Sequence, residues 1–150
     1  MSNSASDRSA DWTVALSHGT LETKNLDAAR RFYAEFLGLE TVRRGELAVW
    51  VRCGGGWMVA CVNTGENMQP PPPDIRWCLD LASADELQSA HADAVRLQAE
   101  YGMQEVLPIK TEGTQSSFLI SDVDGNWWEI CHRPGRLFDH VFESANAEAA

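Results

Sequence analysis

The sequence SDVDGNWWEIC, residues Ser121–Cys131, is typical of a strand end, a tight turn and a following strand. Asp and Asn side chains hydrogen-bond the local backbone in turns, and Gly125 can supply the positive φ that a tight turn needs. Alternation along the second strand places Trp127, Glu129 and Cys131 on one face. A carboxylate among such apolar neighbours is costly to bury alone, so Glu129 predicts a partner: a metal ion, an Arg, a His or water.

Length and composition favour a folded, acidic protein. The chain has 150 residues, of which 44% are hydrophobic, and this suits one domain with a proper core. Its formal net charge of -10 argues against nucleic-acid binding, which needs clustered Lys and Arg. No stretch approaches the roughly 20 apolar residues of a membrane span. The polar start, Met1–Ala10, lacks a signal-peptide hydrophobic region, so we expect a cytoplasmic protein without nucleic-acid or membrane partners.

The four cysteines predict no zinc ribbon and no redox motif, since none of them forms a CxxC pair. All lie in apolar, strand-like surroundings, where a small thiol usually packs in the reduced state: Cys53, Cys61, Cys78 and Cys131.

The first half of the chain predicts one strand, one helix and three short strands. We expect residues 1–11 to be disordered and a strand to run from Trp12 to Thr23. Asn25 is a plausible N-cap for the next helix, and Gly38 is a suitable residue just beyond its end. Three strands then follow between residues 39 and 62.

The second half repeats this order. Ile75–Leu81 alternates as a strand, and Ser83 with Glu86 forms a capping box for a helix that Gly102 ends. Strands are then expected at residues 104–109, 116–121 and 126–132. Residues 137–142 can dock as one helical turn.

The repeat predicts an α+β fold made of two paired βαβββ modules. They cover residues 12–65 and 74–133, joined by a proline-rich linker at 66–73. We expect a single domain over 12–142, with a curved mixed sheet around a cavity and the helices outside. Residues 143–150 are expected to be a frayed tail.

At this level of detail the chain resembles the vicinal oxygen chelate superfamily. That group includes glyoxalase I, fosfomycin- and bleomycin-resistance proteins and extradiol dioxygenases. The resemblance spans about Trp12 to Arg133 and is specific for the fold rather than for the chemistry, because one fold carries many functions. Five stretches carry it: residues 16–21, 25–33, 36–39, 118–126 and 129–130.

The resemblance implies metal ligands, and the sequence departs from them at one position. His18 matches the ligand of the first strand, and Glu129 matches the ligand of the last strand. The second position falls on Arg76, a poor ligand because its guanidinium stays protonated and offers no lone pair. The fourth ligand of glyoxalase I types falls on Val59. A divalent Fe, Mn or Zn is therefore expected to be held weakly or not at all by His18 and Glu129.

The sequence leaves two roles open for Arg76. It can point at Glu129 and neutralise the carboxylate in place of a metal. Alternatively, it can bind a substrate carboxylate or enolate while His18 acts as general base. The aromatic pair Trp57 and Trp127 is expected to line the cavity, with Cys78 and Cys131 beside them.

Two functions remain open from the sequence. One is a lyase, isomerase or dioxygenase acting on a small aromatic or carbonyl-bearing compound, with His18, Arg76 and Glu129 as catalytic residues. The other is a metal-free protein that sequesters a drug or metabolite, as in the bleomycin-resistance branch. In both cases we expect a homodimer, because a second chain can cover the exposed strand edges of the modules.

Overall fold

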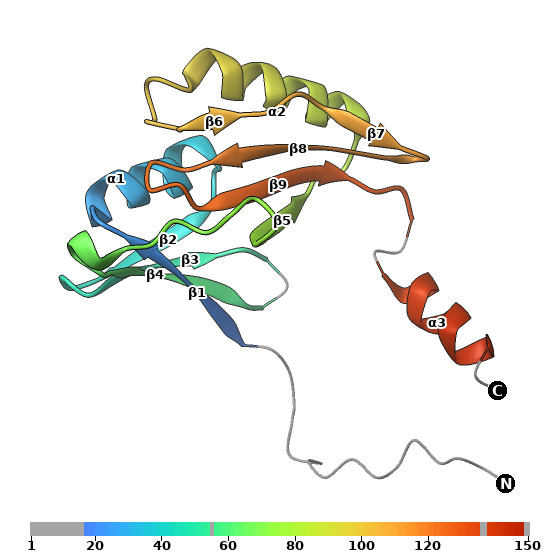
Figure 1. Cartoon of the computed structure of the whole chain (residues 1–150), viewed down its shortest axis with the longest axis horizontal. Coiled ribbons are helices and arrows are strands. Elements are labelled where there is room, and N and C mark those ends of the chain that lie inside the picture. The colour runs from blue at the N-terminus through green and yellow to red at the C-terminus, as the bar shows by residue number, and fades with distance from the viewer. Residues whose placement is uncertain (1–16, 55, 136–137, 149–150) are drawn as a thin grey trace, which may run out of the picture.

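The computed structural model describes residues 17–54, 56–135 and 138–148 (Figure 1). The disorder expected for residues 1–11, and the expected strand residues 12–16, lie outside these ranges. The strands are β1 (His18–Thr23), β2 (Glu40–Arg44), β3 (Ala48–Arg52), β4 (Met58–Asn63), β5 (Arg76–Asp80), β6 (Glu105–Val106), β7 (Lys110–Glu112), β8 (Gln115–Ser121) and β9 (Trp127–His132). The helices are α1 (Leu26–Arg31), the π-helical turn η1 (Phe32–Phe36), the 3₁₀ turn η2 (Gly65–Asn67), α2 (Ala84–Leu97) and α3 (Asp139–Glu148).

The strands form two sheets with matching topology. The first sheet has the order β1-β4-β3-β2, and the second has the order β5-β9-β8-β6, with β7 paired to β8. In each sheet the first strand runs parallel to the last strand of its module, and the other pairings are antiparallel. The expected α+β fold of two βαβββ modules is confirmed.

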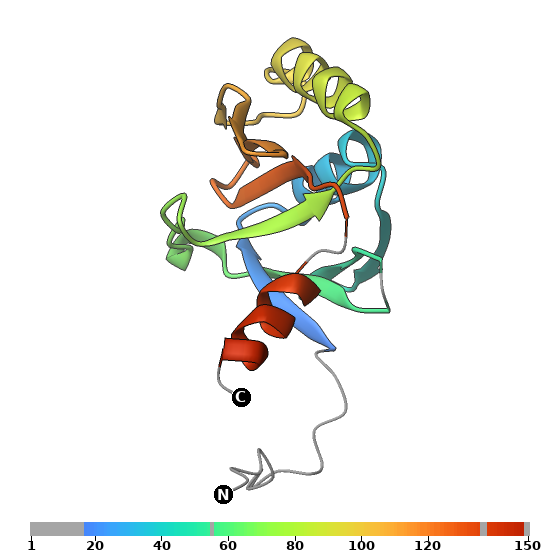
Figure 2. The same cartoon turned by 90° about the vertical axis from the view of Figure 1, so that its right-hand side faces the viewer.

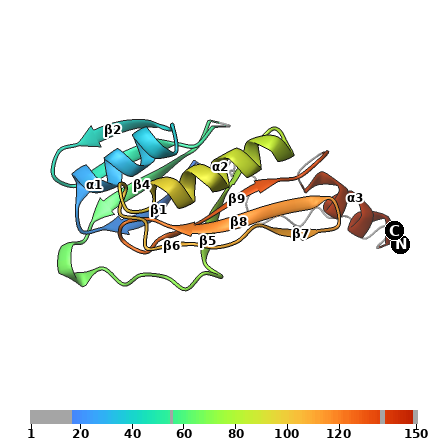
Figure 3. The same cartoon turned by 90° about the horizontal axis from the view of Figure 1, so that it is seen from above.

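Side-chain caps fix the start of both main helices, as the sequence predicts. Asn25 accepts hydrogen bonds from the backbone N–H groups of Asp27 and Ala28 at the start of α1. Ser83 and Glu86 complete the capping box of α2. These caps satisfy N–H groups that have no partner within the helix. Seen from above, α1 and α2 lie over the strands (Figure 3).

One apolar core joins the two modules. α1 packs on β3 and β4, and α2 packs on β8 and β9. The ring of Tyr33 meets the ring of Trp128 across the modules, with centroids 5.6 Å apart. Because these side chains belong to one cluster, neither module buries its helix-facing side without the other.

A buried polar network also ties the modules together, and it is centred on the 121–126 turn. Tyr33 Oη donates to Asp122 Oδ2 over 2.6 Å, and Thr23 Oγ1 donates to Asp124 Oδ2 over 2.5 Å. Asn126 Nδ2 donates both to Asp122 Oδ2 and to the carbonyl of Glu22. The turn of the second module therefore supplies hydrogen-bond partners to the first module.

The network perturbs two of its ionisable groups. Burial raises the pKa of Asp122 above 3.8, although hydrogen bonds from Tyr33 and Asn126 work in the opposite direction. Burial and the charge of Asp122 raise the pKa of Tyr33 well above 10.0, so its hydroxyl keeps the proton it donates.

The first strands of the modules approach closely at a glycine. Gly19 of β1 faces the indole of Trp77 of β5, and a Cβ atom there would lie 2.6 Å from Cζ2 of that ring. The same indole meets Trp57, with ring centroids 5.6 Å apart. A side chain at position 19 would therefore require the Trp77 ring to move.

The chain differs from the sequence expectation in three places. The strand expected at 104–109 is shortened to β6, and a further strand, β7, begins after Pro108 at Lys110. The first helix changes to π-helical geometry at Phe32. α3 runs to Glu148, through residues expected to fray, and extends away from both sheets (Figures 1 and 3).

Among the described residues, no helix combines the length and apolar character that crossing a bilayer requires.

Candidate functional site

A polar hollow of about 400 Å³ lies on the second sheet, and two of the predicted site residues, Arg76 and Glu129, line it. We call it the Glu129 hollow. Along β9, Trp128 and Ile130 join the core, so the alternating Glu129 points to the opposite face. Ser117 and Leu119 of β8 line the same hollow. Its charged lining residues are Asp74, Arg76, Lys110, Glu112, Glu129 and Arg133.

Arg76 and Glu129 form an ion pair in this hollow. Arg76 Nε donates to Glu129 Oε2 over 2.9 Å, and the exposed fractions of the two side chains are 34% and 11%. Arg76 Nη1 also donates to the carbonyl of Pro73 over 3.3 Å. These contacts use two of the five guanidinium N–H groups, so the partly exposed guanidinium keeps donors for a further acceptor.

The surroundings of Glu129 favour its ionised form. Burial alone would raise the pKa of this carboxyl. Hydrogen bonds from Ser117 and Arg76, together with the positive charges of Arg76 and Arg133, outweigh burial and hold the pKa below 4.5. Glu129 is therefore a carboxylate near neutral pH and a weak proton acceptor.

His18 is not among the residues that line this hollow. It begins β1, is exposed, and its Nδ1 lies 3.0 Å from the hydroxyl of Ser17. Its register partner is Met58 of β4, in the first sheet. Within the described part of the chain, no hydrogen bond or ion pair joins His18 to Arg76 or Glu129.

The predicted cavity-lining residues are divided among three places. Trp57 lines a hollow of the first sheet, and Trp127 lines a smaller one between β1, the linker and β5. Cys78 and Cys131 instead contact each other, with their sulfur atoms 3.1 Å apart. The sequence placed all four on inward faces but gave no information on how far apart the two inward faces lie.

The first-sheet hollow has its own character. It encloses about 390 Å³, and its lining includes Trp50, Trp57, Val42 and Arg44. Trp50 is 42% exposed, and the guanidinium of Arg44 stacks over its ring at 4.6 Å. This hollow and the Glu129 hollow share no lining residue.

Several residues of the Glu129 hollow were missed from the sequence. Arg133 was assigned to the tail, although it keeps the parity of Glu129 and Cys131 when the strand alternation is continued. It is held there by a hydrogen bond from Nη1 to Asp80 Oδ1 over 3.0 Å. Lys110 lies on β7, opposite Ser117, and the prediction of one strand over 104–109 stopped short of it.

His18 and Glu129 do not fit a shared divalent metal within one chain. A metal needs lone pairs that converge, whereas the nearest partner of Glu129 is a cationic guanidinium. The alternative that the sequence offered, with Arg76 beside the carboxylate, matches the geometry.

Comparisons with known proteins match this fold. The model of the glyoxalase-like domain family matches residues 18–131. Solved structures resemble the chain at low identity. A lactoylglutathione lyase from Agrobacterium tumefaciens is 20% identical, with a TM-score of 0.56, 80% of this chain covered and 94% of that chain. A glyoxalase-related enzyme from Fulvimarina pelagi is 19% identical, with a TM-score of 0.65 and coverages of 80% and 88%.

A third structure, the hypothetical protein SA1046 from S. aureus, is 16% identical, with a TM-score of 0.64 and coverages of 81% and 95%. At these identities the likeness concerns the fold alone. No curated protein matches the chain.

Proposed function

Because the chain belongs to the glyoxalase-like domain family, we propose that it binds a small carbonyl- or carboxylate-bearing compound in the Glu129 hollow without a metal ion. The observation that carries this proposal is the ion pair of Arg76 and Glu129. The carboxylate fixes the guanidinium and neutralises part of its charge. The remaining N–H donors of Arg76 then receive the oxygen atoms of the ligand.

The lining of the hollow supports a polar ligand. Lys110 and Arg133 supply two further cationic groups, and Ser117 and Gln115 supply neutral hydrogen-bonding groups. Leu107, Leu119 and Phe138 add apolar surface that suits the carbon skeleton or ring of a small molecule. This combination fits an anionic oxygen group attached to an apolar body.

An enzyme of the lyase, isomerase or dioxygenase type is the second candidate. It requires a general base, and Glu129 is a poor one because Ser117 and Arg76 hold its pKa low. His18 has the appropriate chemistry, but it must reach the ligand from outside the Glu129 hollow. The observation in favour of this candidate is the exposure of His18, which leaves its ring accessible to another molecule.

We also propose a homodimer. The first sheet exposes Val42 (49%) and Trp50 (42%), large apolar side chains that a folded chain usually covers. A second copy placed on this face would enclose the first-sheet hollow, and it could bring His18 of one chain near the Glu129 hollow of the other.

Ligand-induced thermal stabilisation tests the binding proposal. Benzoate and pyruvate, an aromatic and a 2-oxo carboxylate, serve as probes, and we expect at least one to raise the Tm of the wild-type protein. Arg76→Gln should abolish the shift. Arg52→Gln, which removes a guanidinium from the first-sheet hollow, should preserve it. An equal shift in Arg76→Gln, or no shift in the wild type with either probe, would contradict the proposal.

Turnover separates the two candidates. If the protein is only a binder, His18→Ala leaves the Tm shift unchanged and no product forms. If it is an enzyme, His18→Ala abolishes product formation while binding persists.

Metal content is a further check. We expect Fe, Mn and Zn to be absent or substoichiometric in the purified protein. One equivalent of a metal that is lost in both His18→Ala and Glu129→Gln would overturn the metal-free site.

A further inference from the structure

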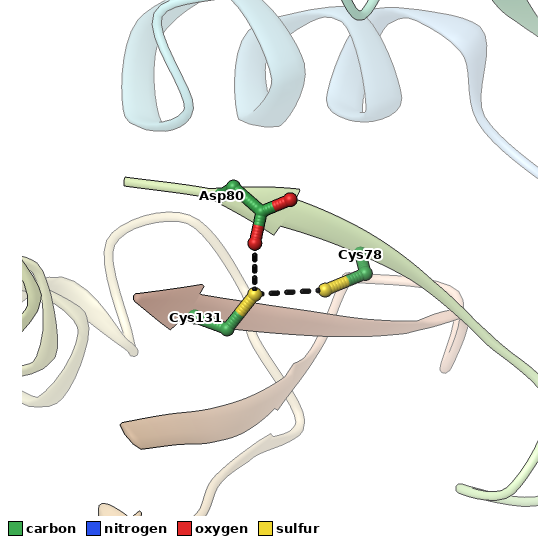
Figure 4. A group of neighbouring side chains, drawn as sticks. All are labelled: Cys78, Asp80 and Cys131. Atoms are coloured by element: carbon green, nitrogen blue, oxygen red, sulfur yellow. Dashed lines mark hydrogen bonds between the residues drawn. The ribbon is translucent and has the colours of Figure 1, made fainter. Parts of the chain in front are cut away.

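A four-residue cluster beside the hollow contains two thiols in contact. Cys78 lies on β5 and Cys131 on β9, and their Sγ atoms are 3.1 Å apart (Figure 4). Cys131 Sγ donates to Asp80 Oδ1 over 2.7 Å. Arg133 donates from Nη2 to Cys78 Sγ over 3.3 Å and from Nη1 to Asp80 Oδ1 over 3.0 Å. Each thiol therefore has its own polar partner.

The two thiols are not equivalent. Cys78 is exposed, and its contact with the Cys131 sulfur and the hydrogen bond from the Arg133 guanidinium lower its pKa below 9.0 despite partial burial. Cys131 is buried, and the hydrogen bond with Cys78, burial and the neighbouring Asp80 carboxylate raise its pKa. The geometry points the same way, because Cys131 donates its proton to Asp80 whereas Cys78 accepts a hydrogen bond from the Arg133 guanidinium. An exposed thiolate beside a cation is the form of cysteine that acts as a nucleophile.

We propose that Cys78 and Cys131 form a thiol–disulfide exchange site for low-molecular-weight disulfides. Cys78 is the attacking residue and Cys131 is the resolving residue. This site is separate from the ligand proposed for the Glu129 hollow and does not depend on it.

The exchange balances in two steps. First, the Cys78 thiolate attacks one sulfur of a disulfide RSSR, the S–S bond breaks, and RS⁻ leaves. Next, Cys131 transfers its proton to Asp80, attacks Cys78 Sγ in the mixed disulfide and expels the second RS⁻, which takes up that proton. The two cysteines are oxidised by two electrons, and RSSR is reduced to one thiol, protonated through Asp80, and one thiolate, which takes its proton from water.

The positions of Cys78 and Cys131 on their strands allow a disulfide bond between them, but with strain. Cys78 lies opposite Glu129 and Cys131 lies opposite Asp80, so the cysteines are diagonal neighbours on adjacent parallel strands. Closing the sulfur separation to a bond length of about 2.05 Å moves the atoms by about 1 Å. β5 is the edge strand of its sheet, so within that sheet it is paired to β9 alone. A strained bridge is readily reduced, which makes the modification reversible.

A metal ion is the competing occupant. Ligand atoms of Cys78, Asp80 and Cys131 all lie within 4.8 Å of one another. Arg133, however, already supplies positive charge to Cys78 and Asp80, and its side chain is only 14% exposed. A divalent cation would have to displace this guanidinium, so the observed contacts favour the exchange site.

Mass spectrometry of the full-length protein tests the proposal, with oxidised glutathione as the probe. The reduced wild type should lose two hydrogen atoms and retain no glutathione. Cys131→Ser should retain one glutathione, mapped to Cys78 by proteolysis. Cys78→Ser should show neither product at this site. Cys53→Ser, which removes a cysteine whose pKa is raised by burial, should behave as the wild type.

Kinetics provide a test that keeps both cysteines. Cys78 should react at least about tenfold faster than Cys53, because its thiolate fraction is larger. Arg133→Gln should slow the first step while the second still proceeds. The proposal is wrong if Cys78 reacts no faster than Cys53, or if the wild type accumulates a stable mixed disulfide. Stoichiometric Zn²⁺ binding that is lost in Cys131→Ser and blocks oxidation would make the cluster a metal site instead.

Discussion

Arg76 Nε and Glu129 Oε2 lie 2.9 Å apart, on the first and last strands of the second module. The charged pair occupies the place where the sequence resemblance implied a metal. Glu129 is nearly buried, so its charge depends on this partner.

Removing Arg76 should therefore destabilise the protein measurably. We expect Arg76→Ala to lower the free energy of unfolding by about 1–3 kcal/mol, between the values for exposed and fully buried pairs, because Arg76 is partly solvated. Glu129→Gln in the same chain should recover part of this loss. The measurement is a double-mutant cycle on denaturant midpoints.

The surface pair Arg52 and Glu40 is the matched control, since both side chains are more than half exposed. Its coupling should stay below about 1 kcal/mol. A coupling near zero for Arg76 and Glu129 would show that the two charges act independently.

The Glu129 carboxylate should also make stability depend on pH. Its pKa in the folded protein lies below 4.5, so its contribution is complete above that pH and is lost as the pH falls through the lower, folded value. The stability difference between wild type and Glu129→Gln should shrink on acidification. Asp122 has a raised pKa and acts in the opposite direction, but it is present in both proteins and cancels. A difference that is constant from pH 7 to pH 3 would refute the ion pair.

Tyr33→Phe should weaken the connection between the modules. The change removes the hydroxyl that donates to Asp122 over 2.6 Å and leaves a buried acceptor with fewer partners. A hydrogen bond to a charged group is worth about 1.5–3 kcal/mol, and thermal or denaturant unfolding should register this loss. Tyr101, the other tyrosine of the chain, is the control. Tyr101→Phe keeps the ring beneath the Arg31 guanidinium and should change stability by less than about 0.5 kcal/mol.

Gly19→Ala should destabilise the crossing of β1 and β5. The added methyl group would lie inside the contact distance of the Trp77 ring, and Trp57 limits the movement of that ring. Overpacking of this kind costs about 1–3 kcal/mol. The smaller ring of Trp77→Phe should relieve the clash, so the double variant should lose less stability than the sum of the two single variants. Simple additivity would mean that the strands separate without strain.

Light scattering should give a mass of about twice the 16.6 kDa chain. Trp50→Asp should shift the protein toward the monomer, because it places a charge on the proposed interface. Val95→Asp alters an exposed apolar residue of α2, outside the proposed interface, and should leave the mass unchanged. A wild-type monomer at micromolar concentration would exclude the proposed dimer.

Strand alternation predicted the second module well. It placed Arg76, Cys78, Glu129 and Cys131 on one face, and the register of β5 with β9 brings these side chains together. Alternation failed where the local pattern was interrupted. The strand expected at 104–109 is only β6 in the structure, and β7 with Lys110 begins after Pro108, beyond the expected strand. Arg133 directly follows β9, which ends at His132 as expected, so strand assignment alone did not include it in the site.

The position of His18 illustrates a different limit. Its parity and its motif were read from the sequence, but its distance from Glu129 depends on how two sheets pack. Sheet packing is set by contacts such as Gly19 against Trp77, which join residues distant in the chain. Periodicity reports on one strand at a time, and it carries no information about the angle between sheets.

The bond between Thr23 and Asp124 spans 101 positions of the chain, and it has a consequence for biosynthesis. The first module leaves the ribosome long before the residue that completes its polar network has been translated. Until Asp124 emerges, the nascent chain carries an unfinished core that is open to chaperones and proteases. Productive folding of the first module therefore waits until Asp124, in the second module, has been translated.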